Sequence, residues 1–156
     1  MRSDNLLLVL LCASLCRDPS GAQGVQPPVF TKEGELAIMS AAGTLRVKID
    51  IEIAETGEEQ AQGLMYRESM EEHQGMLFVF AREDEKVFWM KNTPLPLDML
   101  FIDRAGGIVT ICRNTVPYSE EAYASGTKVK YVLEVNAGVV DRYRITVGDR
   151  VYWQRM

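Results

Sequence analysis

The segment from Thr44 to Glu55 constrains the fold most, because its side chains alternate between apolar and polar with a period of two. The apolar set is Leu45, Val47, Ile49, Ile51 and Ile53, and the residues between them are Arg46, Lys48, Asp50, Glu52 and Ala54. This alternation is typical of an antiparallel strand with one face on the core and the other in water. Residues 36–39, joined to it through Ala42 and Gly43, are its expected hairpin partner.

The rest of the chain continues in short apolar runs separated by turn-forming residues. We predict further strands at residues 76–80, 87–90, 97–102, 108–113, 128–135 and 151–153. The charged cluster 82–86 is expected to form a hairpin tip, and residues 114–126 a surface loop. Thr56, with Glu59 three residues later, predicts a capping box at the start of a short helix, and Ser69 with Glu72 repeats the pattern.

These elements place the chain in the mainly β class, because strands and helices do not alternate along it. The predicted architecture is an antiparallel jelly-roll-like sandwich or a partly closed barrel, with one or two short helices. A chain of 156 residues, 47% of them hydrophobic, is long enough to bury one core. We therefore expect a single β domain over residues 35–156, preceded by a linker or loose arm at 23–34.

The first 22 residues have the features of a signal peptide. Residues 6–15 are apolar, and the small residues Ser20, Gly21 and Ala22 favour cleavage after Ala22. An N-terminal core helix is the alternative, but polar residues are not interleaved there at helical period. A lipoprotein is disfavoured, because a lipid-attachment cysteine follows a small residue, whereas Leu11 and Leu15 precede the two leader cysteines. We expect a periplasmic or secreted protein whose one mature cysteine, Cys112, is a buried structural residue that forms no internal disulfide.

Composition and motifs exclude several functional classes. The formal net charge of −5 lacks the basic footprint of a nucleic-acid-binding protein. The longest apolar run is shorter than the roughly 20 residues that a membrane span requires. The sequence holds no Gly-x-Ser-x-Gly elbow, no Walker-type phosphate loop and no zinc-type cysteine and histidine spacing, so we expect no cofactor. Four glutamates, Glu52, Glu55, Glu58 and Glu59, are interpreted as a hydrated acidic patch.

Two carboxylates break the strand pattern. Asp98 shares a predicted strand face with Leu100 and Ile102, and Glu134 shares one with Val132. An acid on an apolar face is costly unless it is paired or hydrogen-bonded. One interpretation is structural, with both acids capping loops or forming internal ion pairs. The other is a pocket at one end of the sheet that binds a polar or anionic ligand, with candidate residues Arg67, Lys91, Asn92, Asp98 and Glu134 and an aromatic wall of Tyr66, Phe88 and Trp89.

A series of short motifs carries a resemblance to a known family. In order, the motifs are Gly63-Leu64-Met65-Tyr66-Arg67, Gly75-Met76-Leu77-Phe78, Phe88-Trp89-Met90-Lys91-Asn92-Thr93, Pro96-Leu97-Asp98, Phe101-Ile102-Asp103, Val132-Leu133-Glu134 and Gly148-Asp149. Over roughly residues 36–154 the chain resembles the prokaryotic domain of unknown function 192 family, DUF192. The resemblance implies a small, often exported β domain with a jelly-roll-like fold. It implies no activity, substrate or catalytic residue.

Three functions stay open at this point. The first is a non-enzymatic binding module for a polar or anionic small molecule or a glycan, with no catalytic residue. The second is a hydrolase, possibly directed at glycans, in which Asp98 and Glu134 form an acid and base pair. The third is binding of a soft metal such as Cu(I) through Met65, Met70, Met76, Met90 and Met99, with Trp89 and His73 nearby. The sequence gives no indication of the oligomeric state.

Overall fold

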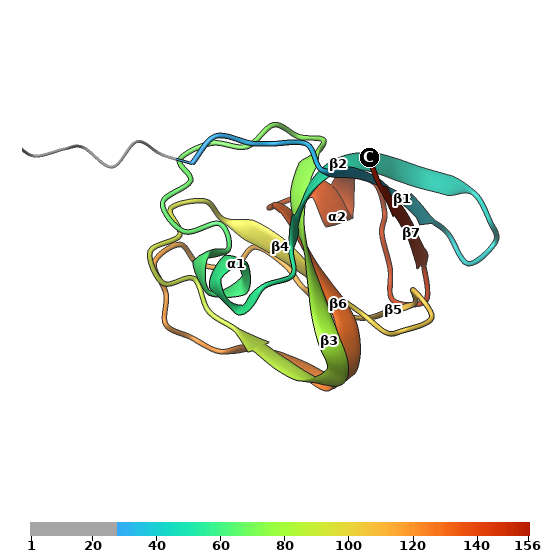
Figure 1. Ribbon diagram of the computed structural model, residues 1–156. Coiled ribbons are helices and arrows are strands. Elements are labelled where there is room, and N and C mark those ends of the chain that lie inside the picture. The colour runs from blue at the N-terminus through green and yellow to red at the C-terminus, as the bar shows by residue number, and fades with distance from the viewer. Residues whose placement is uncertain (1–27) are drawn as a thin grey trace, which may run out of the picture.

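The computed structural model describes residues 28–156 (Figure 1). The predicted signal peptide, 1–22, and the first part of the predicted arm, 23–27, lie outside the described residues. Seven strands and two short helices follow in the order β1 (Gly34–Met39), β2 (Leu45–Ala54), α1 (Gly57–Gln62), β3 (Gln74–Phe88), β4 (Leu97–Ile102), β5 (Ile108–Cys112), β6 (Tyr123–Asn136), α2 (Val139–Arg142) and β7 (Arg150–Arg155). None of the helices in this range is long and apolar enough to cross a membrane.

All seven strands belong to one curled sheet with the order β5-β4-β6-β3-β2-β1-β7. The sheet forms a half-barrel, which confirms the mainly β prediction in its partly closed barrel form and not as a two-sheet sandwich. Neighbouring strands are antiparallel except for β2 and β3, which pair in parallel. An isolated bridge between Gly107 and Arg150 joins the turn before β5 to the start of β7, where the sheet curls toward itself.

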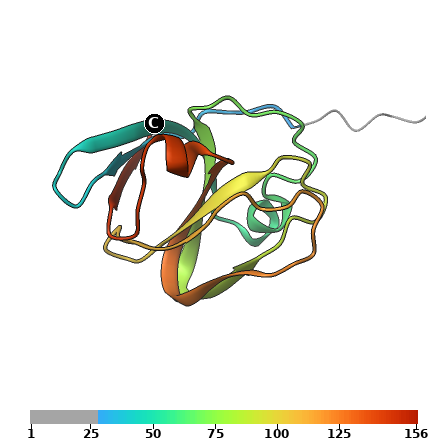
Figure 2. The same cartoon turned by 180° about the vertical axis from the view of Figure 1, so that it is seen from behind.

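The central strands carry an apolar core on each face. The inner core, within the curl, contains Ile49, Ile51, Leu77, Leu100, Leu133 and Val140. The outer core contains Leu64, Met76, Phe78, Met99, Phe101 and Val132. Figures 1 and 2 show α1 on one side of the long β3–β6 pair, with α2, β1 and β7 on the other. Alternation along each strand therefore assigns a side chain to one core or the other, and no single face is left entirely to water.

The hairpin and the helix start predicted from the sequence are both confirmed. β1 pairs with β2 in the antiparallel register that places Leu36 opposite Ile49. Thr56 caps α1 through a complete capping box with Glu59. The second capping signature, at Ser69 and Glu72, does not start a helix, and residues 67–71 are irregular. Without the apolar periodicity that would hold a helix on the sheet, the cap alone does not form one.

The predicted hairpin tip at 82–86 is wrong, because β3 runs unbroken from Gln74 to Phe88. β6 pairs with it along this length and begins at Tyr123, inside the segment expected to be a surface loop. Register shifts between Val79 and Asp84 mark an irregular stretch of this pairing. Figure 1 shows the two strands bending together and turning beneath α1. Charged side chains fit here because the bent part of β3 has β6 as its one paired neighbour, which leaves side chains open to water.

Candidate functional site

Glu134 is the acid that the sheet register places on the outer core. Glu134 lies in β6, opposite Met76 of β3 on one side and Met99 of β4 on the other. Both thioether side chains therefore flank it on the same face of the sheet. Its side chain is 4% exposed. Within residues 28–156 its carboxyl makes no side-chain hydrogen bond or ion pair, and burial raises its pKa to about 8. Glu134 is thus a buried acid with no compensating partner in the described part of the chain.

Asp98 does not join Glu134, which corrects the prediction that the two acids face one ligand. Asp98 pairs with Val135, whereas Glu134 pairs with Met99, so the two carboxylates point to opposite faces of the sheet. The Asp98 carboxylate accepts hydrogen bonds from the backbone N–H groups of Asn114 at 2.9 Å, Gly138 at 2.9 Å and Val140 at 3.0 Å. These bonds cap the first turn of α2 from β4, and they match the structural interpretation of Asp98.

Arg67 is also occupied by the fold. Its guanidinium is buried, and a terminal nitrogen lies 2.7 Å from a carboxylate oxygen of Glu52, although the contact is not aligned as a hydrogen bond. The Arg67 Nε has no acceptor among the described residues. The other Glu52 oxygen accepts the Thr31 N–H at 3.0 Å. The expected hydrated patch is therefore corrected at Glu52, because the arm at Thr31 and the segment at Arg67 cover this end of β2.

Three further predicted residues lie in loops beside the cavity described below and do not line it. The Tyr66 N–H donates to the Asn92 carbonyl at 2.8 Å, which ties the loop after α1 to the loop after β3. Both residues have positive φ, 62° at Tyr66 and 56° at Asn92. A left-handed tyrosine is strained, and the surrounding structure must hold it there. Lys91 is exposed, with its Nζ 3.7 Å from Glu120 and 5.7 Å from the centre of the Trp89 ring.

A cavity of about 290 Å³ lies between α1 and the bent half of β3. Three of the residues predicted from the sequence line it: the acid Glu134 and the aromatic residues Phe88 and Trp89. Trp89 lies at the exposed rim of the cavity. The remaining lining residues come from α1 and its following turn, from β3 and from the loop after β3: Gln60, Ala61, Gln62, Gly63, Leu64, Met65, Phe78, Phe80, Lys86, Val87 and Thr93. Most of this surface is apolar or aromatic, and Lys86 and Glu134 are its charged or ionisable members.

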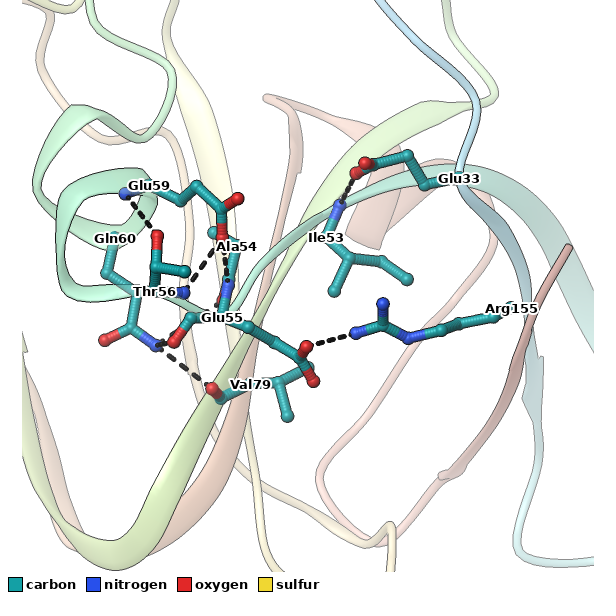
Figure 3. Close-up of polar contacts among 9 residues, drawn as sticks. All are labelled: Glu33, Ile53, Ala54, Glu55, Thr56, Glu59, Gln60, Val79 and Arg155. Carbon is teal, nitrogen blue, oxygen red and sulfur yellow. Dashed lines mark hydrogen bonds and ion pairs between the residues drawn. The ribbon is translucent and has the colours of Figure 1, made fainter.

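The wall formed by α1 is fixed to the sheet by Gln60. Its side-chain amide donates to the carbonyl oxygens of Val79 at 3.0 Å, Glu55 at 3.1 Å and Ala54 at 3.4 Å (Figure 3). The capping box at Thr56 closes the same turn, and Arg155 of β7 forms an ion pair with Glu55. The cavity is therefore bounded by a preformed wall, as expected of a small-molecule site.

The aromatic side of the cavity is built from rings packed edge to face. Phe78 and Phe88 have ring centres 5.0 Å apart at 88°, and Phe80 and Phe88 have ring centres 6.4 Å apart at 79°. Lys86 Nζ lies 4.4 Å from the centre of the Phe80 ring. Phe88 and Phe101 also pack edge to face, with ring centres 6.0 Å apart at 81°, so Phe88 contacts three rings in this favourable geometry.

The methionines of the copper hypothesis are divided among several surroundings. Met76, Met90 and Met99 are buried in the outer core, Met70 packs against it, and Met65 lines the cavity. His73 is exposed and lies beside Tyr143, with ring centres 5.9 Å apart. Within residues 28–156 there is no group of three or more His, Cys, Asp and Glu side chains that could hold a metal ion. Cys112 is partly buried, and burial raises the pKa of its thiol, which disfavours the reactive thiolate.

Sequence reasoning missed several residues of the cavity. Gln60 and Lys86 gave no signal, because each lies in a stretch rich in charged or polar residues. Phe78 belongs to an apolar run whose orientation depends on register, and only the pairing with Val132 sets it on the outer face. Thr93 belongs to the motif at residues 88–93, but a lone threonine in a loop does not distinguish a buried hydroxyl from an exposed one, and here it is buried. The family motifs at residues 63–67 and 88–93 could have indicated the cavity, since both segments contribute residues to its lining.

Comparison with known proteins gives a family without an assigned activity. The model of the DUF192 family, described as "Uncharacterized ACR", matches residues 37–153. A crystal structure from Sinorhizobium meliloti 1021, described as a candidate transcription regulator, is similar with a TM-score of 0.76 and 41% identity, covering 81% of this chain and 98% of that chain. A protein of unknown function from Novosphingobium aromaticivorans DSM 12444 has a TM-score of 0.72 and 34% identity, covering 76% of this chain and 84% of that chain. No curated protein matches. The family match spans most of the chain, and the protein belongs to the DUF192 family.

Proposed function

We propose that this chain is a non-enzymatic binding module that takes a small molecule into the cavity between α1 and the bent half of β3. The observation that carries the proposal is Glu134, which lines the cavity, is almost fully buried and has no side-chain partner among the described residues. A buried acid without a partner destabilises the folded chain. A ligand that hydrogen-bonds to this carboxyl would compensate it, whereas a purely structural acid would have its partner within the protein, as Asp98 does.

The lining restricts the kind of ligand. The body of the molecule must be apolar or have one flat apolar face, because rings and aliphatic side chains form most of the walls. A polar group must then reach Glu134. The anionic ligand considered from the sequence is disfavoured, because Arg67 is engaged with Glu52 and Lys91 lies outside the lining. Lys86, the cation in the lining, stands over the Phe80 ring, and an anion near it would share the cavity with the Glu134 acid.

The alternatives receive less support from the geometry. An acid and base pair of Asp98 and Glu134 needs both carboxyls in one cavity, and the register separates them by the thickness of the sheet. The regulatory role suggested for the Sinorhizobium protein belongs to that protein. A net charge of −5 disfavours contact with DNA phosphates in this chain.

Blocking the cavity tests the proposal. A library of amines, alcohols, sugars and carboxylic acids is screened against residues 23–156 by thermal shift, and hits are confirmed by NMR. Ala61, an exposed lining residue on α1, is replaced by tryptophan to fill the cavity mouth, and Ala122→Trp in the exposed loop before β6 is the matched control. We expect hits that bind the parent and Ala122→Trp but not Ala61→Trp. Hits that bind all three proteins equally, or a screen without hits, would contradict the proposal.

A further inference from the structure

We infer that the cavity selects ligands carrying an ammonium group, which enters between the aromatic rings and forms an ion pair with Glu134. The inference rests on the proposed function and names its ligand class. Three features support it: the Glu134 carboxyl, the aromatic rings of the lining, and the positions of Lys86 in the lining and Lys91 beside it.

The Glu134 carboxyl lacks the partner that an ammonium group would provide. Glu134 is flanked by two thioethers, and its carboxyl meets no hydrogen-bond donor among the described residues. A hydroxyl ligand would satisfy one hydrogen bond and leave the ionised form of the acid uncompensated. An ammonium brings both a donor and the opposite charge, which in a desolvated site makes a stronger contact than a neutral donor does.

The rings favour a cation over an anion. Phe78, Phe80, Phe88 and Trp89 are the four aromatic residues that line the cavity. An aromatic face carries negative electrostatic potential, so a cation within about 6 Å of the ring centre is attracted and an anion is repelled. A cavity lined by four aromatic rings and one carboxyl can therefore hold an ammonium group by cation–π contacts and an ion pair together.

Two lysines of the protein already form cation–π contacts with rings that line the cavity. Lys86 Nζ stands 4.4 Å over Phe80, and Lys91 Nζ stands 5.7 Å over Trp89. Each stands over a ring that lines the cavity, and the two other lining phenylalanines, Phe78 and Phe88, have no lysine over them among the described residues. Lys86 lines the same cavity and so opposes an incoming cation, whereas it would attract an anion. Removing its charge must therefore change affinity with opposite sign for the two ligand classes.

The test compares three small molecules of one shape: 2-phenylethylamine, 2-phenylethanol and 3-phenylpropanoate. Isothermal titration with residues 23–156 near pH 8 is expected to give the tightest binding for the amine. Glu134→Gln should weaken the amine more than about thirtyfold and change the alcohol little, because only the amine loses an ion pair. Lys86→Gln should tighten the amine by about threefold and weaken any binding of the carboxylate. Lys128→Gln, at an exposed residue of β6 outside the cavity lining, is the matched control.

A proton count separates ion pairing from simple hydrogen bonding. The ammonium binds the ionised acid, so near pH 7 binding should release close to one proton, measured as a heat that depends on the buffer. Because burial raises the pKa of Glu134 to about 8, the apparent affinity for the amine should be about fiftyfold weaker near pH 6 than near pH 8. The groups facing the carboxyl from the neighbouring strands are Met76 and Met99, and Lys86 is the charged group elsewhere in the lining.

The outcomes distinguish this inference from the proposed function. If the alcohol or the carboxylate binds as well as the amine, or if Lys86→Gln weakens the amine, ammonium selectivity is refuted while the cavity remains a binding site. If Glu134→Gln leaves amine binding intact, the ion pair is refuted as well. If none of the three binds and the library screen is also empty, the proposed function itself fails.

Discussion

The buried acid makes a direct prediction about stability. The pKa of Glu134 is about 8 in the folded chain, against an ordinary value of 4.5, and burial is the cause. The folded state therefore holds a proton that the unfolded state has lost throughout the interval between these values. Since the folded state binds more protons there, the free energy of unfolding falls as the pH rises from about 4.5 to about 8.

The size of the effect follows from the shift. Each pKa unit corresponds to about 1.4 kcal/mol, so Glu134 should remove about 4 kcal/mol of stability between about pH 5 and about pH 8.5. Glu134→Gln retains the shape of the side chain and cannot ionise. Subtracting the curve of this variant from that of the parent cancels the titration of other groups. Relative to the parent, the variant should thus gain about 4 kcal/mol over this pH interval.

Urea unfolding, followed by tryptophan fluorescence at several pH values, measures this difference. Glu121→Gln, at an exposed residue of the loop before β6, is the control and should run parallel to the parent. Parallel curves for the parent and Glu134→Gln would refute the raised pKa of Glu134, because the carboxyl would then ionise in the folded chain as easily as in water. A saturating amine that restores stability near pH 8 would link this experiment to the cavity.

Four further predictions concern the supports of the site and the leader. Asp98→Asn should cost about 3 kcal/mol in urea unfolding, because it presents an amide where backbone N–H groups need an acceptor, and it should leave ligand affinity unchanged. Glu52→Gln should cost about 3–5 kcal/mol by stranding buried Arg67, and the double variant Glu52→Leu with Arg67→Met should recover most of this loss in a double-mutant cycle. Gln60→Ala should cost about 1–2 kcal/mol and weaken any cavity ligand, an outcome checked by unfolding and titration together. Expression of the full chain with its leader should give a mature protein that begins after Ala22, which intact-mass measurement of the periplasmic fraction tests.

Local patterns were sufficient for much of the fold. The alternation before Glu55 set the β1–β2 hairpin, and the spacing of Thr56 and Glu59 set the start of α1. The unbroken course of β3 was beyond these patterns, because a charged run in a two-stranded extension resembles a turn in composition. Its strand character comes from pairing with β6, a contact between residues distant in sequence.

The site shows the same division between local and long-range information. The sequence identified Asp98 and Glu134 as acids on apolar faces, and both are buried. It could not assign them to opposite faces, because a change of one residue in register reverses the face of every side chain in a strand. Nor could it find the partner of Arg67, since Glu52 alternates like a solvent-facing residue and becomes buried only when distant segments cover it.

The parallel pairing of β2 with β3 has a consequence for how such a protein diversifies. Parallel neighbours cannot be joined by a tight turn, so the chain must travel back along the sheet through residues 55–73, and this crossover carries α1 and the turn that borders the cavity. Insertions or substitutions in the crossover can remodel one side of the cavity while the strand ladder keeps its hydrogen bonds. Relatives with altered crossovers can therefore acquire new ligand preferences without refolding the sheet, and chimeras exchanging this segment offer a route to engineer them.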